Sequence, residues 1–309
     1  MTPQDAQAMA QTALSAWGGG VAELVQIREN IVFRARLDDG RDVALRLHRP
    51  QYRSPAQITA ELSWCAQLAD AGFPAPAPVP CADGKMTVTI AGRSVSCVTW
   101  LAGDVIGTEH TPLGADRCGM MRQIGALIAQ LHAASAPQFD TAMRWDAAAL
   151  IGPAPRWGRF WENPAFDAAD QRLLDAARRF AAARLSAGQF SEGAIHGDLL
   201  RENILSRANG LALIDFDDCG HGYLLYDLAT ALIQSFEAPD FDALSHALLM
   251  GYAPDRAQAL AQDLPLFVML RAFASAGWVM SRAAQDDPRA ALYAARARIA
   301  ATRVLEATE

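Results

Sequence analysis

The chain has 309 residues, 51% of them apolar, so it can bury a sizeable core, and its length suggests about two domains of roughly 150 residues each. Its formal net charge of −7 disfavours a nucleic-acid-binding protein, which usually presents a basic face. The five cysteines are scattered and form no C-x-x-C pair, which indicates reduced thiols in a cytoplasmic protein and offers no support for a structural zinc site.

The N-terminal segment, residues 1–16, is polar and rich in alanine, and it lacks the basic and apolar regions of a signal peptide. No later stretch holds ~18 uninterrupted apolar residues, the length that a membrane-spanning helix requires. We therefore expect neither a cleaved leader nor a membrane partner. No pattern in the sequence indicates an oligomeric state.

Residues 1–101 predict a small lobe of strands around one helix. Three glycines at 18–20 break an N-terminal helix, and Asp38-Asp39-Gly40 is a strong hairpin signal between two β-type runs. Ser54-Pro55 starts the next helix, because proline is suited to the first helical turn. The expected strands are 21–27, 31–37, 43–47, 86–90 and 93–100.

After residue 101 the pattern becomes mainly helical. Arg117–Ala133 is amphipathic, and a second such helix is expected at 167–185. Two short strands, at 204–205 and 211–214, are hinged on an Asn-Gly pair. From residue 226 onward the chain is expected to be helical, with breaks near Pro239, Pro254, Pro265 and Pro288.

The strongest functional pattern lies in residues 195–205, I-H-G-D-L-L-R-E-N-I-L, where Asp198 precedes Asn203 by five positions. The following strand ends in L-I-D-F-D-D, which contains Asp215. Phosphoryl transfer needs a carboxylate that takes the acceptor proton, and oxygen ligands that hold Mg²⁺ across a triphosphate. Kinases place these groups in an H-x-D-x-x-x-x-N loop and in an Asp after the next strand. Either motif alone occurs by chance as a capped loop or a solvated turn, but their order and spacing together favour a kinase-type site.

Several segments together carry a resemblance to a known family: HGDLLRENIL, LIDFDDCGHGYLLYDLA, VALRLHRP, GALIAQLHA and the helix residue Glu61. Over nearly its whole length the chain resembles the aminoglycoside phosphotransferase and choline kinase branch of the protein-kinase-like superfamily. Homoserine-kinase-like enzymes and a stress-response Ser/Thr kinase are similar members. The resemblance implies an α+β, bilobal fold. Residues 1–101 would form the nucleotide-binding lobe, a small antiparallel β-sheet with one helix, and residues 102–309 a helical lobe with the catalytic loop and the acceptor pocket.

The resemblance also implies roles for the motif residues. Asp198 would orient and deprotonate the acceptor hydroxyl, and the donor would be ATP. Asn203 and Asp215 would ligate Mg²⁺. Asp217 would serve as a further ligand or as a network residue.

Two further residues of the motifs are expected to support the loop rather than to react. His196 would hold the loop through hydrogen bonds of its ring. Asp227 would either cap the start of a helix or brace the catalytic loop.

The phosphate-binding half departs from the kinase pattern. Where kinases usually carry a strand lysine paired with a helix glutamate, this chain offers Arg46 and Glu61. Of its 27 basic residues only Lys85 is a lysine, so Arg46 partly reflects composition. Arginine is always charged and can bind phosphate through two N–H groups, so Arg46 is the predicted phosphate ligand, against the alternative of a surface arginine on an exposed strand face.

The glycine-rich phosphate loop of kinases is also absent. In its place lies a polar turn that contains Arg28 and Asn30, which we expect either to face the nucleotide or to be ordinary turn residues. The backbone of Thr99 and Leu101, at the predicted hinge between the lobes, is expected to contact adenine.

The predicted activity is transfer of a γ-phosphoryl group to a hydroxyl of a small molecule, such as an antibiotic or an amino alcohol. A Ser/Thr protein kinase is the first alternative, but only ten residues separate Phe216 from Asp227, too few for a peptide-binding activation segment. A non-catalytic nucleotide-binding regulator is the second. Arg271 is expected either to hold an anionic acceptor or to brace a carboxylate such as Asp217.

Overall fold

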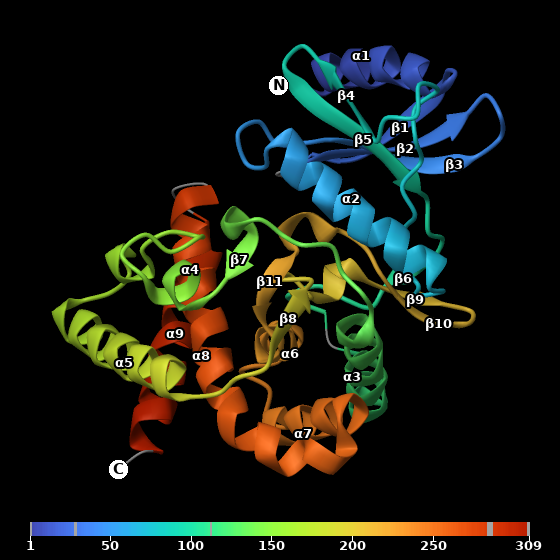
Figure 1. Ribbon diagram of the computed structural model, residues 1–309. Coiled ribbons are helices and arrows are strands. Elements are labelled where there is room, and N and C mark those ends of the chain that lie inside the picture. The colour runs from blue at the N-terminus through green and yellow to red at the C-terminus, as the bar shows by residue number, and fades with distance from the viewer. Residues whose placement is uncertain (1, 28–29, 112, 283–286, 308–309) are drawn as a thin grey trace. The chain divides into compact units, whose positions relative to one another are not determined.

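The computed structural model describes residues 2–27, 30–111, 113–282 and 287–307. Its helices and strands are labelled in Figure 1. The contacts divide the chain into two compact units, and each unit contains segments that are distant in sequence. The first unit comprises Met1–Asp104, Ala134–Asp140 and Ser206–Asp217, and the second comprises Val105–Ala133, Thr141–Leu205 and Asp218–Glu309.

The first unit is built on a five-stranded antiparallel sheet with the order β1-β2-β3-β5-β4 (Figure 1). All five predicted strands are confirmed, each within one residue of its expected bounds. The elements are α1 (Pro3–Leu14), β1 (Gly20–Ile27), β2 (Ile31–Leu37), β3 (Asp42–Leu47), α2 (Pro55–Asp70), β4 (Thr87–Ile90) and β5 (Arg93–Thr99).

Successive residues of a strand point to opposite faces of the sheet. Helix α1 packs on one face of this sheet and α2 on the other. Leu45 of β3 belongs to the core cluster that contains Ala10 of α1. Its neighbour Ala44 packs in a separate cluster with Leu62 of α2. By the same alternation Arg46, two positions after Ala44, faces α2.

The start of α2 follows from local sequence, as predicted. The hydroxyl of Ser54 accepts a hydrogen bond from the backbone N–H of Gln57, and the side chain of Gln57 accepts one from the N–H of Ser54. This reciprocal cap satisfies two N–H groups that an isolated helix end would leave unbonded. Pro55 fills the first position, where no N–H is needed.

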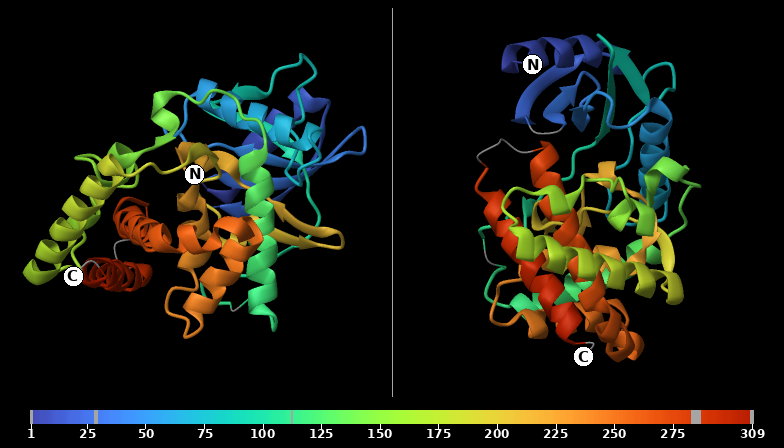
Figure 2. Two further views of the ribbon diagram at one scale, coloured as in Figure 1. Left: turned by 60° about the horizontal axis from the view of Figure 1, so that its bottom comes forward. Right: turned by 90° about the vertical axis from the view of Figure 1, so that its left-hand side faces the viewer.

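The second unit is mainly helical, and its longest helices pack in pairs. Helix α8 runs alongside α9 in both views of Figure 2, and α3 lies against α7. The predicted helix at 117–133 is confirmed, and the one expected at 167–185 forms with Asp167 as its cap. The helices are α3 (Arg117–Ala133), α4 (Ala147–Ile151), α5 (Ala168–Ala187), α6 (Leu224–Ile233), α7 (Phe241–Tyr252), α8 (Ala257–Arg282) and α9 (Arg289–Glu306).

Helix α8 corrects one prediction, the break expected near Pro265. The helix continues through this proline, although a proline inside a helix removes one backbone hydrogen bond. The residues that follow, Leu266–Leu270, are all buried, and this packing offsets the lost bond. By length and composition α8 could cross a membrane, but 78% of its apolar window is buried inside the protein, as in a core helix.

Short strands hold the two functional loops. The sequence predicted β9 and β10 but missed β6, β7, β8 and β11, since runs such as G-H-G-Y show no apolar alternation. The predicted catalytic loop, which contains Asp198 and Asn203, lies between β8 and β9, and Asp215 follows β10. The short strands are β6 (Asp104–Val105), β7 (Arg144–Trp145), β8 (Glu192–Ile195), β9 (Ile204–Arg207), β10 (Gly210–Leu213) and β11 (Gly220–Tyr223), in sheets ordered β10-β9-β6 and β7-β11-β8.

Candidate active site

The catalytic loop makes a sharp turn at Gly197 in the second unit. Its φ angle of +82° lies in the left-handed region that side chains rarely adopt. A Cβ atom there would also lie 2.6 Å from the carbonyl oxygen of Asp218. Gly197 is thus required in this loop, because the backbone of Asp218 leaves no room for a side chain.

Asp198 is held at both oxygens of its carboxylate. The side-chain amide of Asn203 donates to the Asp198 backbone carbonyl at 2.8 Å and to Oδ2 at 3.2 Å. The guanidinium of Arg271 donates to Oδ1 at 3.2 Å. The Asp198 side chain remains 24% exposed, so it can still be approached by a hydroxyl group. The structure thus brings together two of the predicted site residues, Asp198 and Asn203.

Arg271 occupies the second of its two predicted roles, because it braces a carboxylate, that of Asp198. The Arg271 side chain is buried, donates to the Ser275 hydroxyl at 2.6 Å, and lies 4.9 Å from the ring centroid of Trp157. A cation over an aromatic face is stabilised by the ring quadrupole. Arg271 is therefore a fixed positive charge next to Asp198. The sequence of α8 alone does not reveal this role.

Asp227 braces the catalytic loop, which decides between its two predicted roles. From α6 its carboxylate accepts backbone N–H bonds from His196 and Gly197, both at 2.8 Å. The Nε2 atom of His132 lies 3.1 Å from the same carboxylate. The Nδ1 atom of His196 in turn accepts from the N–H of Asp198 at 3.3 Å, as expected for a loop-supporting ring. The motif helix GALIAQLHA thus contributes His132 to this network.

Replacing Asp227 by Asn is expected to loosen this loop. The amide would present an N–H donor to one of two backbone N–H groups, which leaves a buried donor unsatisfied at a cost of about 1–3 kcal/mol. We expect a lower midpoint of thermal unfolding and a turnover reduced about tenfold, with nucleotide affinity retained. Asp263→Asn, at a partly exposed ion pair, is the matched control. An unchanged unfolding midpoint would contradict the bracing role.

In the first unit, Arg46 and Glu61 form the buried ion pair that the sequence predicted. The Arg46 Nη1 atom donates to Glu61 Oε1 at 2.8 Å, and Nη2 lies 3.5 Å from Asp215 Oδ1. Burial lowers the pKa of Arg46, but the charges of Glu61, Asp215 and Asp217 outweigh it and leave the pKa raised. Burial raises the pKa of Glu61, partly offset by Arg46. Arg46 is thus a buried cation near Asp215 and Asp217, two of the predicted metal ligands, rather than a surface arginine.

Asp215 adopts an unusual backbone conformation. Its φ angle is +64°, in the left-handed region where an aspartate is uncommon. Such strain clusters at functional sites, where the surrounding structure over-determines the conformation. The side chain of Asp215 is 38% exposed, so its carboxylate is accessible to a ligand.

Asn30 and Asp217 are joined by a hydrogen bond. The Asn30 amide donates to Asp217 Oδ2 at 2.7 Å and accepts from the backbone N–H of Arg49 at 2.9 Å. The backbone carbonyl of Asp217 accepts from the Nε–H of Arg53 at 2.9 Å. Asp217 therefore makes the contacts of a network residue, one of the two roles predicted for it. The other residue predicted in this turn, Arg28, lies outside the described residues.

The predicted hinge residues Thr99 and Leu101 differ in whether their backbone N–H groups form hydrogen bonds within the described part of the first unit. The N–H of Thr99 donates to the carbonyl of Ala77 at 2.7 Å, and the N–H of Trp100 donates to that of Asp42 at 3.0 Å. Leu101 follows β5 and is half-buried. The N–H of Thr99 is thus used within its own unit, and Leu101 is the better candidate for contact with a base.

The burial of His48, which directly follows β3, predicts that the stability of the fold depends on pH. Burial, and then the charges of Arg46 and Arg93, lower its pKa well below the usual 6.5. The folded protein therefore keeps His48 neutral while the unfolded chain protonates it, so stability falls as the pH drops below 6.5, by up to about 1.4 kcal/mol per pH unit.

Replacing His48 by Gln should make this loss shallower, because the amide can face Ser96, which the ring contacts at 2.8 Å, without titrating. Urea unfolding at pH 7 and pH 5 measures the difference, and His110→Gln, at an exposed histidine, is the control. Equal losses in wild type and His48→Gln would refute the assignment.

The predicted metal ligands suit Mg²⁺ by their chemistry. Asn203, Asp215 and Asp217 supply amide and carboxylate oxygens, the ligands that hard divalent cations prefer. Within the described ranges no group of three His, Cys, Asp or Glu side chains is gathered closely enough to hold a metal. The predicted ligands would therefore suit an ion that is bound by one or two carboxylates and whose coordination is completed by substrate phosphates and water.

Asp198 and Asn203 thus lie together in one loop, and Arg46 pairs with Glu61. Residues 23–261 match the model of a family described as the phosphotransferase enzyme family. The chain belongs to this phosphotransferase family. The predicted resemblance, the α+β kinase-like fold and the phosphotransferase class are thereby confirmed.

Three relatives illustrate the similarity of the phosphotransferase to known proteins. A homoserine kinase of Acidiphilium cryptum is 31% identical over 258 residues, which are 82% of this chain and 76% of the relative. A solved microcompartment-associated aminopropanol kinase has a TM-score of 0.80 at 28% identity, covering 97% of this chain and 98% of its own. An amicoumacin kinase solved with AMP-PNP, Ca²⁺ and Ami shares the fold, with a TM-score of 0.70 at 19% identity over 93% and 88% of the two chains.

Proposed function

We propose that the phosphotransferase moves the γ-phosphoryl group of ATP to the hydroxyl of a small amino alcohol. The observation that carries the proposal is the arrangement at Asp198. Its carboxylate is oriented by Asn203 and Arg271, is anchored on a loop braced by Asp227, and remains partly exposed. A carboxylate in this position can orient an acceptor hydroxyl and take its proton as the phosphoryl group is transferred.

The donor side of the proposal assigns ATP and Mg²⁺ to the residues predicted from the motifs. Arg46, fixed by Glu61, would contact the phosphates, and Leu101 would contact adenine. Asn203 and Asp215 would hold the metal, with Asp217 as a further ligand or network residue. Bound Mg²⁺ would neutralise charge on the phosphates. Residues 1–101 would thus bind the nucleotide, and residues 102–309 would bind the acceptor.

The acceptor class is inferred from the relatives. By their names, one acts on homoserine and another on aminopropanol, and each of these is a short molecule with an amino and a hydroxyl group. The aminopropanol kinase is similar over almost its entire length, so a pocket for a comparably small acceptor is the simplest expectation.

An acceptor panel tests the proposal directly. Release of ADP from ATP and Mg²⁺ would be followed with aminopropanol, ethanolamine, homoserine, choline and kanamycin, and the product identified by ³¹P NMR. We expect an amino alcohol to give the highest kcat/KM and a phosphate monoester as product. Preferential phosphorylation of kanamycin would refute the acceptor class, and nucleotide binding without any product would support a non-catalytic regulator instead.

We also place the protein in the cytoplasm. All five cysteines are free thiols, and their positions support no disulfide in the described parts of the chain. Reduced cysteines are characteristic of a reducing compartment, where ATP is abundant.

A further inference from the structure

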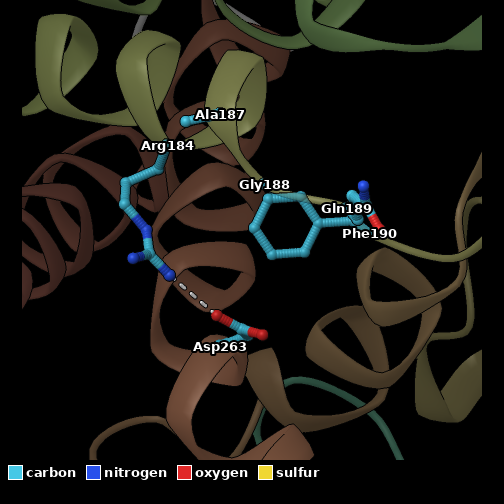
Figure 3. Close-up of a pocket in the computed structure, with 6 residues that line it drawn as sticks. All are labelled: Arg184, Ala187, Gly188, Gln189, Phe190 and Asp263. Carbon is cyan, nitrogen blue, oxygen red and sulfur yellow. Dashed lines mark hydrogen bonds and ion pairs between the residues drawn. The ribbon is translucent and has the colours of Figure 1, made fainter.

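Two hollows of different electrostatic character lie outside the catalytic loop. One, of about 170 Å³, is in the second unit, where Arg184 of α5 and Asp263 of α8 line it with the ring of Phe190 (Figure 3). Its two charged groups pair with each other at 2.9 Å. The opposite charges of this hollow cancel, so it offers little attraction to a charged ligand.

The other hollow, of about 360 Å³, lies in the first unit where β3 ends, α2 begins and the turn between β4 and β5 approaches. Arg49, Arg53 and Arg93 line it together with His48, and none of its described lining residues is acidic. In a chain whose net charge is −7, three guanidinium groups around one hollow form a local positive site.

Arg93 is the group in this hollow that most directly indicates a ligand. Its Nη1 atom is enclosed by protein and has no hydrogen-bond partner in the parts of the chain that the structure describes. Burial lowers the pKa of Arg93. A turn of the Arg93 side chain toward the hollow would let a bound anion accept a hydrogen bond from this unpaired N–H.

The loop between β3 and α2 preorganises the other two arginines. The ring of Tyr52 lies near both, 5.6 Å from the Cζ atom of Arg49 and 5.5 Å from that of Arg53. Gln51, which also lines the hollow, has a φ angle of +62°, a strained value for a residue other than glycine. The start of α2 at Ser54 adds the positive end of a helix dipole, which favours an anion.

We propose that this hollow binds the phosphate group of inorganic phosphate or of a small phosphate monoester, held by Arg49, Arg53 and Arg93. Planar guanidinium groups match phosphate oxygens through paired, charge-assisted hydrogen bonds. Arg46, the proposed phosphate ligand of the nucleotide, does not line this hollow, although Arg53 contacts Asp217 and Arg49 contacts Asn30. Its volume leaves room for a small organic group attached to the phosphate.

Isothermal titration of the full chain, saturated with AMP-PNP and Mg²⁺, tests the site with two probes, inorganic phosphate and O-phosphoethanolamine. We expect one-to-one binding that Arg93→Gln weakens about tenfold, the usual effect of losing a charged hydrogen bond. Arg36→Gln, at an exposed arginine of β2, is the matched control and should leave binding unchanged. Tighter binding of the ester would identify a metabolite as the ligand, and equal binding would identify the phosphate group itself.

Three results would overturn the proposal. They are no binding of either probe at millimolar concentration, equal affinity in wild type and a folded Arg93→Gln variant, and binding that occurs only when AMP-PNP is left out. The last would assign the arginines to the nucleotide site. If thermal unfolding shows that Arg93→Gln does not fold, Arg49→Gln, on a half-buried loop side chain, takes its place with the same expected loss.

Discussion

Asp198→Asn is expected to reduce turnover about 10²–10⁴-fold, the usual contribution of a general base. The amide keeps the size of the side chain but cannot take a proton from the acceptor hydroxyl. It also removes the negative charge that faces the buried guanidinium of Arg271, so some loss of stability is expected as well. Steady-state kinetics with the best acceptor of the panel measures the effect.

Two controls separate the chemical role of Asp198 from a structural one. The affinity for AMP-PNP, measured by calorimetry, should remain close to that of the wild type, because the nucleotide ligands are unchanged. Asp242→Asn, at an exposed carboxylate of α7, should retain full turnover. If Asp198→Asn is folded and keeps near-normal phosphoryl transfer, Asp198 is not the catalytic base.

Removing the carboxylate of Asp215 is expected to abolish metal-dependent nucleotide binding and to reduce turnover at least about 10²-fold. Metal-ion stabilisation is worth several kcal/mol in transferring phosphoryl groups, and about 1.4 kcal/mol corresponds to a factor of ten. Arg46 would also lose one of its carboxylate neighbours. In Asp215→Ala, we expect the affinity for AMP-PNP with Mg²⁺ to fall to the value measured in EDTA.

The backbone conformation of Asp215 calls for a second variant. Alanine at a φ of +64° adds strain, whereas asparagine tolerates the left-handed region. Asp215→Asn therefore tests the charge with the backbone preserved, and Asp83→Ala, at an exposed carboxylate in the same unit, is the control. A Mg²⁺ dependence that survives in Asp215→Asn and Asp215→Ala alike would remove Asp215 from the metal site.

The sheet of the first unit could be predicted because its signals are local. The turn Asp38-Asp39-Gly40 joins two alternating strands, and Gly40 indeed adopts a φ of +90°. Ser54 and Pro55 mark the start of α2 through contacts with residues at most three positions away. By contrast, the break predicted at Pro265 is wrong, because the burial that keeps α8 continuous comes from other helices.

The candidate site was predicted as a set of residue types but not as a set of contacts. The spacing of Asp198 and Asn203 is read directly from the chain, and the short loop brings them together. The partner of Arg271 could not be read in this way, because Asp198 is 73 positions distant. His132, which contacts Asp227 from α3 across 95 positions, belonged to a quoted motif but had no assigned role.

The sequence by itself determined the class of chemistry, because phosphoryl transfer requires a base, an amide and a carboxylate in an order that two short motifs preserve. The kinase pattern of a strand cation paired with a helix glutamate also predicted the pairing of Arg46 with Glu61, which the structure confirms. Only the tertiary structure decided what Arg271 and Asp227 do and where three arginines surround one hollow. These features join residues from separate elements, and their contacts depend on packing that no local pattern encodes.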